Sequence, residues 1–305
     1  MKAWIWIAGL LLVFAAGELS AQRQRQVSPS SGAGRTLTVL TEPGTAKAIV
    51  WVDGVRRGVT DSAGRLAQIK TSSGAHTLRV RATGFKEVTT PVNAAQRGEI
   101  RVRLVRTTDE AELAFQQAET ARESSRDEAS RQQAVDLYRR TIQIRQAFPA
   151  AHLGLARLLL DLNDTNGALT EIEAARRFKA NYPEASAVEG RIYRETAQTD
   201  EAIGAFNRAI RESHGFQPEA HVGLGRVYED KGQYDLAARE FQIALDQLFE
   251  TEPIIYQMLG AAYEKTGQNK EAIAAYENYL RLAPDGSLAP AVRSIIEQLR
   301  EQLPD

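Results

Sequence analysis

The chain has 305 residues, of which 43% are hydrophobic and 25% are charged, and its formal net charge is −1. This composition is typical of globular domains, so it excludes a largely disordered chain and a protein that crosses a membrane many times. At roughly 150 residues per domain, the length predicts about two domains. The sequence contains no cysteine, which excludes disulfide bonds, thiolate nucleophiles and cysteine-bound metals.

The first residues have the pattern of an export signal. Lys2 is followed by an uncharged stretch from Ala3 to Ala16, which is shorter than the ~20 residues that a membrane-spanning helix needs. We expect a signal peptide over residues 1–21, with cleavage after Ala21. Because Leu19 is less typical than Ala at the third position back, an uncleaved anchor is the alternative. The polar, turn-rich residues 22–35 are expected to form a flexible linker.

Positive and negative charges are distributed unevenly along the chain. Residues 22–106 contain 15 Lys and Arg against 5 Asp and Glu, whereas residues 107–305 contain 22 against 33. The first part therefore carries a net +10 and the second a net −11. This asymmetry indicates that the basic part meets an anionic partner or that the two parts attract one another, while solubility alone is the simpler explanation.

Residues 36–106 have the pattern of a small antiparallel β-sandwich. Runs rich in Val, Ile, Leu and Thr are separated by Gly, Pro and Asp, and Asp53 with Gly54 supplies a hairpin turn. We expect strands at 36–41, 47–52, 65–70, 76–82, 87–92 and 99–105. Arginines occupy the outward positions of two strands, and we expect them to share one sheet face and to bind anionic surfaces: Arg79, Arg81, Arg101 and Arg103.

Several motifs of this region resemble the PEGA domain, a β-sandwich associated with the bacterial cell envelope. The matching residues are Thr41-Glu42-Pro43-Gly44-Thr45-Ala46, Val50-Trp51-Val52-Asp53-Gly54, Gly58, Gly74-Ala75-His76-Thr77-Leu78-Arg79-Val80 and Gly84-Phe85-Lys86. The resemblance implies an accessory or interaction module without catalytic activity.

The rest of the chain is internally repetitive. Small residues recur at steps of 34 or 35 residues, each followed four residues later by a bulky one, at Ala134, Ala168, Ala202, Ala237 and Ala272. A second series of small residues comprises Ala156, Gly190, Gly225 and Gly260. Such a period predicts stacked helical hairpins, in which the small residues let neighbouring helices approach closely.

This spacing resembles the tetratricopeptide repeat, most fully in Leu259-Gly260, Tyr263, Gly267, Ala272, Tyr276 and Pro284. The resemblance implies an all-α superhelical solenoid of about five units over residues 109–286. Four units begin near Pro149, Pro183, Pro218 and Pro253. The first unit, from Asp109 to Phe148, is divergent, and we expect a longer turn between its helices around residues 124–130. Residues 287–305 are expected to form a capping helix.

The sequence gives catalysis little support. His152 and His221 occupy equivalent repeat positions two units apart, so they cannot bind one metal ion, and packing or exposure is the simplest account of His76 and His214. Acidic pairs such as Asp200-Glu201 fall at helix ends, where solvation explains them. We therefore expect no catalytic residues, no metal site, no cofactor and no nucleic-acid partner. A hydrolase built on the carboxylates is the remaining alternative.

Recognition of a partner is better supported than catalysis. The resemblance implies that the first helix of each unit lines an inner groove, and that the residue after its small residue points into that groove. Arginine occupies this position in three units, with a fourth arginine one turn further: Arg157, Arg191, Arg226 and Arg194. Guanidinium groups suit an acidic protein or peptide. Neutralisation by Glu195, Glu229 and Asp230 is the alternative.

These observations predict an exported, non-enzymatic scaffold of the bacterial cell envelope or periplasm. We expect it to bind protein or peptide partners through the groove of the repeats, and to meet a membrane only through an uncleaved N-terminal segment. The alternative is a basic PEGA-like module that attaches to an anionic cell-wall polymer or surface polysaccharide and displays the repeats. Secretion beyond the envelope is also compatible with a cleaved signal.

Overall fold

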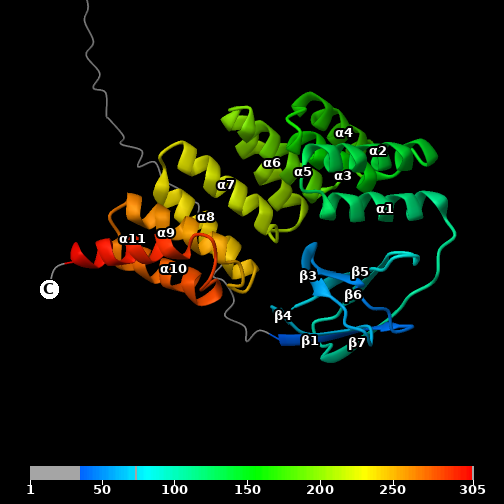
Figure 1. Ribbon diagram of the computed structural model, residues 1–305, viewed down its shortest axis with the longest axis horizontal. Coiled ribbons are helices and arrows are strands. Elements are labelled where there is room, and N and C mark those ends of the chain that lie inside the picture. Colours follow the sequence, from blue (N-terminus) through cyan, green and yellow to red (C-terminus); the bar gives the residue numbers. More distant parts are fainter. Residues whose placement is uncertain (1–34, 73, 304–305) are drawn as a thin grey trace, which may run out of the picture.

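The computed structural model describes residues 35–72 and 74–303, in which seven strands are followed by eleven helices (Figure 1). The predicted signal over residues 1–21 and the predicted linker as far as residue 34 lie outside the described residues. Within the described residues, no helix is both long and apolar enough to cross a membrane. We call residues 35–106 the β module and residues 109–303 the helical array.

The β module is a sandwich of two sheets, with strand orders β4-β1-β7 and β3-β2-β5-β6. Its strands are β1 (Arg35–Glu42), β2 (Ile49–Val52), β3 (Val55–Val59), β4 (Arg65–Thr71), β5 (His76–Arg81), β6 (Val88–Val92) and β7 (Gly98–Arg103). Inward-pointing residues of both sheets, among them Leu37, Val50, Leu78 and Val102, form its core. The alternation of apolar and polar residues along each strand thus buries one face of each sheet.

The sandwich differs from the prediction in two ways. First, β3 is a strand that the sequence pattern missed, and it pairs with β2 across the hairpin turn at Asp53 and Gly54. These two residues have φ angles of 51° and 79°, which fits the type I′ turn that two-residue hairpins favour. Second, β7 pairs with β1 in parallel, because the chain crosses from one sheet to the other after β6. The sandwich is therefore not purely antiparallel.

Ordered structure begins at Arg35, one residue before the predicted start and inside the predicted linker. The Arg35 side chain is buried in the β module. Its Nη1 donates hydrogen bonds to the carbonyl oxygens of Asn93, Ala94 and Gln96 at 2.9, 2.8 and 3.0 Å, and its Nη2 donates to that of Gly74 at 2.8 Å. Because this charged side chain donates hydrogen bonds to four carbonyl groups, it holds the start of β1 in place.

The helical array consists of five antiparallel hairpins and a final helix. The helices are α1 (Glu110–Ser124), α2 (Glu128–Ile144), α3 (Pro149–Asp161), α4 (Thr165–Phe178), α5 (Pro183–Glu195), α6 (Thr199–Glu212), α7 (Pro218–Asp230), α8 (Tyr234–Gln247), α9 (Pro253–Lys265), α10 (Asn269–Leu282) and α11 (Ala289–Glu301). Proline occupies the first position of α3, α5, α7 and α9. Its fixed φ and missing N–H suit that position, so these prolines mark where each unit begins.

The turn inside the first hairpin is not longer than the others, so that prediction is wrong. Only residues 125–127 separate α1 from α2, and the later hairpins have turns of the same length, for example 162–164. Instead, the extra residues lengthen the helices themselves, because α1 has 15 residues and α2 has 17, whereas α3 has 13. Asp127 caps α2 by accepting from Ser130 N at 2.7 Å. This cap fixes the start of α2 directly after the three-residue turn.

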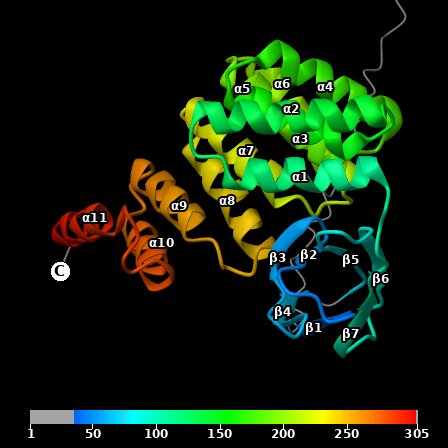
Figure 2. The same cartoon turned by 45° about the vertical axis from the view of Figure 1, so that its right-hand side comes forward.

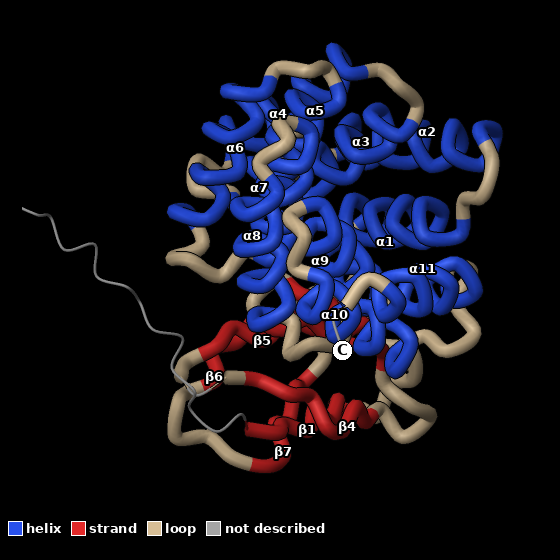
Figure 3. Tube along the Cα trace, turned by 90° about the vertical axis from the view of Figure 1, so that its left-hand side faces the viewer, coloured by secondary structure: helices blue, strands red, loops and turns tan. Residues whose placement is uncertain are grey.

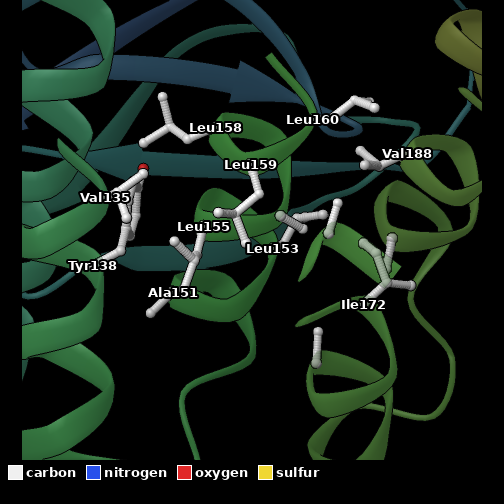
Figure 4. Packing of buried hydrophobic residues seen from close by; sticks show 14 of the residues in the cluster. Val135, Tyr138, Ala151, Leu153, Leu155, Leu158, Leu159, Leu160, Ile172 and Val188 are labelled. Carbon is white, nitrogen blue, oxygen red and sulfur yellow. The ribbon is translucent and has the colours of Figure 1, made fainter. Parts of the chain in front are cut away.

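Glycines of the first helices lie against aromatic rings of the second helices, as the predicted close approach requires. A Cβ atom added to Gly190, Gly225 or Gly260 would come within 2.7, 2.4 or 2.7 Å of an aromatic ring atom. The rings belong to Phe206, Phe241 and Tyr276. In the second unit, side chains of α3 such as Leu155 and Leu159 fill the space between Tyr138 of α2 and Ile172 of α4 (Figure 4).

The β module lies on the inner side of the array, which is the side lined by the first helix of each unit. Figure 2 shows it directly below α1, with β3 beside α8, and Figure 3 shows the strands gathered on one side of the helices. At the other end of the chain, α11 covers α10 by burying Val292, Ile296 and Leu299. The array is therefore covered at its last unit by a helix and on its inner side by the β module.

Candidate functional site

The β module is joined firmly to α1 through the side chain of Gln116. Its Oε1 accepts from Gly84 N at 2.8 Å and its Nε2 donates to the carbonyl oxygen of Phe85 at 2.8 Å. Beside it, Arg81 Nη1 of β5 lies 2.9 Å from Glu119 Oε2 of α1. Because buried amides and ion pairs need good partners, this double contact fixes how the module sits on the array.

A second contact joins the hairpin of β2 and β3 to the loop between α8 and α9. The guanidinium carbon of Arg57 lies 5.4 Å from the centre of the Phe249 ring. Val55 packs against the apolar cluster formed by α8 to α11. The β module therefore reaches from the first unit of the array to its fourth and fifth units.

Between these two contacts lies a cleft with a volume of about 1330 Å³. One wall is the outer face of β2 and β5, and the other is made by α1, α3, α5, α7 and α9 with the turns that precede α5, α7 and α9. First helices thus line the inner surface, as the tetratricopeptide resemblance implied. A cleft of this size lies above the range typical of small-molecule sites, roughly 300–1,000 Å³.

The two ends of the cleft differ in chemistry. Toward α7 and α9 the lining mixes apolar side chains, including Phe216, Val222, Ile254, Ile255 and Met258, with polar ones such as Gln217, Glu219 and Glu252, and Ile254 is 47% exposed. Toward β5, α1 and α3 the lining contains aromatic rings and guanidinium groups: Trp51, Arg79, Arg81, Phe115, Arg122, Arg157 and Tyr182. A lining in which apolar and polar groups are mixed suits a polypeptide segment better than a uniformly charged polymer.

The predicted groove arginines do not form one ladder. Arg157 and Arg226 line the cleft, whereas Arg191 and Arg194 do not. Arg191 Nη2 lies 2.7 Å from Asp161 Oδ1 and its Nε lies 2.8 Å from Glu195 Oε1, and Arg194 Nε lies 2.8 Å from Asp230 Oδ2. Neighbouring carboxylates thus pair with these two arginines. Of the four predicted groove arginines, two line the cleft, namely Arg157 and Arg226.

The arginines of the β module do not share one face either, because β5 and β7 belong to different sheets. Arg79 and Arg81 on β5 face the helices, and Arg81 is buried between Glu87 and Glu119, with distances of 2.7 and 2.9 Å. Arg101 and Arg103 on β7 are exposed on the sheet that is remote from the helices. The predicted four-arginine surface is therefore wrong, since α1 covers Arg81.

Glu119 interacts with several arginines where the β module meets α1. Burial alone would raise the pKa of Glu119, but the positive charges of Arg122 and Arg81 hold it below its ordinary value. Burial would likewise lower the pKa of Arg122, but the charge of Glu119 raises it. The Glu119 carboxylate also accepts a hydrogen bond from the Tyr138 hydroxyl. This carboxylate therefore stays ionised and serves as the counter-charge of the surrounding arginines.

Two buried polar atoms of the cleft have no hydrogen-bond partner among the described residues: Arg122 Nε and Glu184 Oε2. One is a donor and the other an acceptor. Since buried polar groups are normally paired, a bound segment that offers both a donor and an acceptor would satisfy them. A polypeptide backbone offers both at every residue other than proline.

Three of the four histidines pair with carboxylates in separate parts of the molecule, and the fourth, His214, lines the cleft. His76 Nδ1 lies 2.6 Å from Asp53 Oδ2, His152 Nδ1 lies 2.6 Å from Glu171 Oε2, and His221 Nδ1 lies 2.7 Å from Glu240 Oε2. Within residues 35–72 and 74–303 no three residues of the metal-binding types come together as a candidate metal site. His152 and His221 each join the two helices of their own unit, which is a packing role.

Several residues of the cleft escaped the sequence analysis. Trp51 was expected only as part of a strand, yet it lies under the guanidinium groups of Arg79 and Arg81, at 4.4 and 5.2 Å from its ring centre. Tyr182, which precedes α5, and Glu184, in its first turn, are not singled out by repeat spacing, and Gln116 lies in the divergent first helix. The residues directly before Pro183, Pro218 and Pro253 line the cleft, so their position before a helix-starting proline was an available signal.

Comparisons with known proteins bear on the helical array. Three models of the tetratricopeptide repeat match residues 126–192, 188–253 and 254–285. No curated protein matches the chain. The resemblance of the β module to the PEGA domain has no counterpart among these matches.

Two solved structures share the helical fold. PilF of Pseudomonas aeruginosa is 15% identical, with a TM-score of 0.53, and the match covers 63% of this chain and 90% of that one. PilW, described as a widely conserved type IV pilus biogenesis factor, is also 15% identical, with a TM-score of 0.53 and coverage of 65% and 93%. At this identity the likeness concerns the fold alone. The three repeat models, which together match more than half of the chain, show that residues 126–285 belong to the tetratricopeptide repeat family.

Proposed function

We propose that this protein is a non-enzymatic scaffold that binds a segment of a partner protein in the cleft between the β module and the helical array. The observation that carries the proposal is the cleft itself, with a volume of about 1330 Å³, one end that mixes apolar and polar side chains and one end rich in guanidinium groups. Solenoids of helical repeats present extended concave surfaces to their partners. The weak pairing of Arg157, whose Nη2 lies 3.7 Å from Glu219 Oε2, leaves it available to an acidic partner.

The experiment is selection of binders from a library of random 12-residue peptides displayed on phage, with the full chain as bait. We expect enrichment of peptides that compete with one another for one site. Replacing both Arg157 and Arg226 with Glu should abolish their capture. The matched control is Arg191→Glu, because Arg191 occupies the equivalent repeat position but lies outside the cleft. Capture lost through Arg191→Glu and kept in the double variant would place binding elsewhere and overturn the proposal.

We further propose that the protein is exported to the cell envelope or periplasm, with the β module as a PEGA-like accessory domain. The charge-free stretch from Ala3 to Ala16 after Lys2 supports export. Fractionation followed by N-terminal sequencing tests it. A mature chain that begins at Gln22 would show cleavage, a full-length chain in the membrane fraction would show an anchor, and a full-length chain in the cytosol would refute export.

A second candidate function is attachment to an anionic cell-wall polymer through the outer sheet of the β module. Arg101 and Arg103 are exposed there, and the Arg101 side chain is 67% exposed. However, Arg101 is shared between Glu42 and Glu99, at 3.2 and 3.4 Å, which weakens its pull on a polymer. Sedimentation with isolated cell wall at low salt tests this candidate. Binding that is indifferent to salt and to replacing both arginines with Ser would exclude it.

A further inference from the structure

Arg79 is held on the β-module wall of the cleft without a close carboxylate. Its guanidinium group stacks on the Trp51 ring, 4.4 Å from the ring centre. The nearest carboxylate belongs to Glu87, whose Oε1 lies 4.0 Å away, and that carboxylate is closer to Arg81, at 2.7 Å. Stacking on tryptophan orients a guanidinium group while leaving its edge N–H groups open. Arg79 is therefore positioned but weakly paired.

The opposite wall presents Arg157, Tyr182 and Glu184 to the same part of the cleft. Arg157, Tyr182 and Glu184 line the cleft together with Arg79 of the other wall. Burial and the charge of Glu184 raise the pKa of Tyr182, and the positive charges of Arg157 and Arg79 act to lower it. Glu184 Oε2 is buried without a hydrogen-bond partner among the described residues. This end of the cleft therefore combines two weakly paired guanidinium groups, one from each wall, with one unsatisfied acceptor.

We propose that the β module forms one wall of the binding site itself, where Arg79 and Arg157 together hold the acidic side chain of an extended partner peptide. Glu184 Oε2 accepts a backbone N–H of the same peptide. The inference rests on the proposed function, because it assigns the partner chemistry of the cleft. A polyanionic chain fits this site poorly, because Glu184 and Glu219 on the helical wall would repel its successive charges.

The end of the cleft toward α7 sets a second requirement on the peptide. Val222, Ile254 and Met258 of α7 and α9 offer apolar contacts to an aliphatic side chain. Two steps between packed helices, from α3 with Arg157 over α5 to α7 with Val222, correspond to about 16–20 Å at the usual ~8–10 Å between packed helices. An extended chain covers ~3.3–3.6 Å per residue. The aliphatic residue should therefore lie about four to six residues from the acidic one.

The test uses the phage-selected 12-residue peptides and the full chain. We expect them to share an Asp or Glu and an aliphatic residue about four to six positions apart. Fluorescence anisotropy of the most enriched peptide should show that Arg79→Ser weakens binding about ten- to a hundredfold. The matched control is Arg101→Ser, an outward arginine of the other sheet. Replacing the peptide's acidic residue with its amide should weaken binding to the wild type more than it weakens binding to Arg79→Ser, in which Arg157 alone still contacts that residue.

Each outcome separates this inference from the proposed function. If the peptides bind Arg79→Ser as tightly as the wild type but fail to bind the Arg157 and Arg226 double variant, the groove binds peptides and the β-module wall does not. If no peptide is enriched, both ideas fail. Melting curves check that Arg79→Ser still folds, and Glu184→Gln provides a second variant that leaves the Trp51 stack intact. Unchanged affinity in Arg79→Ser would overturn the inference, and unchanged affinity in Glu184→Gln would remove Glu184 from the site.

Discussion

Arg81 of the β module and Glu119 of α1 form an ion pair, with Nη1 2.9 Å from Oε2, and it is the charged centre of the junction between the two modules. Glu119→Gln would leave Arg81 with Glu87 alone and Arg122 without its carboxylate partner. We expect a loss of about 3 kcal/mol in the free energy of unfolding, because removing one member of a buried pair strands the other charge. Urea denaturation measures it.

Glu110→Gln is the matched control for this prediction, since Glu110 lies on the same helix with a side chain that is 70% exposed. It should change stability by less than about 0.5 kcal/mol. Because the pKa of Glu119 is lowered on folding, its contribution is present above its unfolded pKa and is lost as the pH falls through the folded one. Equal effects of the two substitutions would show that the junction does not depend on this carboxylate.

Gly225→Ala should destabilise the array by about 1–3 kcal/mol, because overpacking forces neighbouring side chains to move. The added Cβ atom would lie 2.4 Å from Cε1 of Phe241. Gly204→Ala is the control, since a Cβ atom there meets nothing within 4 Å. In that open helical position alanine should stabilise by roughly 0.5–1 kcal/mol. Thermal unfolding of the two variants should therefore shift in opposite directions.

Ala197→Gly should raise stability by about 1 kcal/mol, because an L-residue in the left-handed region pays roughly that cost. Ala197 has a φ of 58° in the turn between α5 and α6, where Gln198 N donates to the carbonyl oxygen of Tyr193 at 2.8 Å. Gly232 holds the equivalent position of the next-but-one turn, with a φ of 71°. Gly232→Ala should lower stability by a similar amount, and denaturant midpoints would report both changes.

His152→Gln should cost more stability in acid than in alkali. Burial of the ring opposes its charged form, but hydrogen bonds to Glu171 and to the Gln146 carbonyl raise the pKa of His152 above its ordinary value. The stabilisation is therefore complete below the unfolded pKa of about 6.5 and is lost as the pH rises through the folded pKa. Below about pH 6 the loss should reach roughly 1.5–3 kcal/mol, the usual worth of a charged hydrogen bond.

The control for His152 is a double-mutant cycle with Glu171→Gln. If the pair acts as described, His152→Gln should lose its pH dependence in the Glu171→Gln background, because the partner that stabilises the charged ring is gone. Denaturation at several pH values provides the comparison. A pH dependence that persists without Glu171 would assign the effect to another group.

The repeats could be predicted from the sequence because they depend on local, periodic requirements. Proline at the start of the first helix and a small residue beneath the aromatic ring recur in the later units, so Pro218, Gly225 and Phe241 appear at regular spacing. The edge strand β3 could not be predicted, because it contains Arg56, Arg57 and Gly58 and buries no residue completely. Without a buried face, a strand has no apolar alternation to detect.

The cleft was only partly predictable, because its residues become important through contacts distant in sequence. Arg81 occupies an outward strand position, so its pattern indicates exposure, yet α1 lies over it some forty residues later in the chain. Arg191 follows the same spacing as Arg157, but Asp161, thirty residues earlier, neutralises it. Spacing indicates which face of an element a residue occupies. It does not show what covers that face.

The contact between Arg57 and Phe249 changes how the array should respond to force. A stack of repeats touches only its neighbours, so it extends under tension like a spring. Here the β module is fixed to α1 by Gln116 and also touches the loop before α9, so it acts as a brace across the coil. Pulling the two ends apart must first detach this brace. A partner bound in the cleft would stiffen the helical array further, because it would contact the β module and the array at the same time.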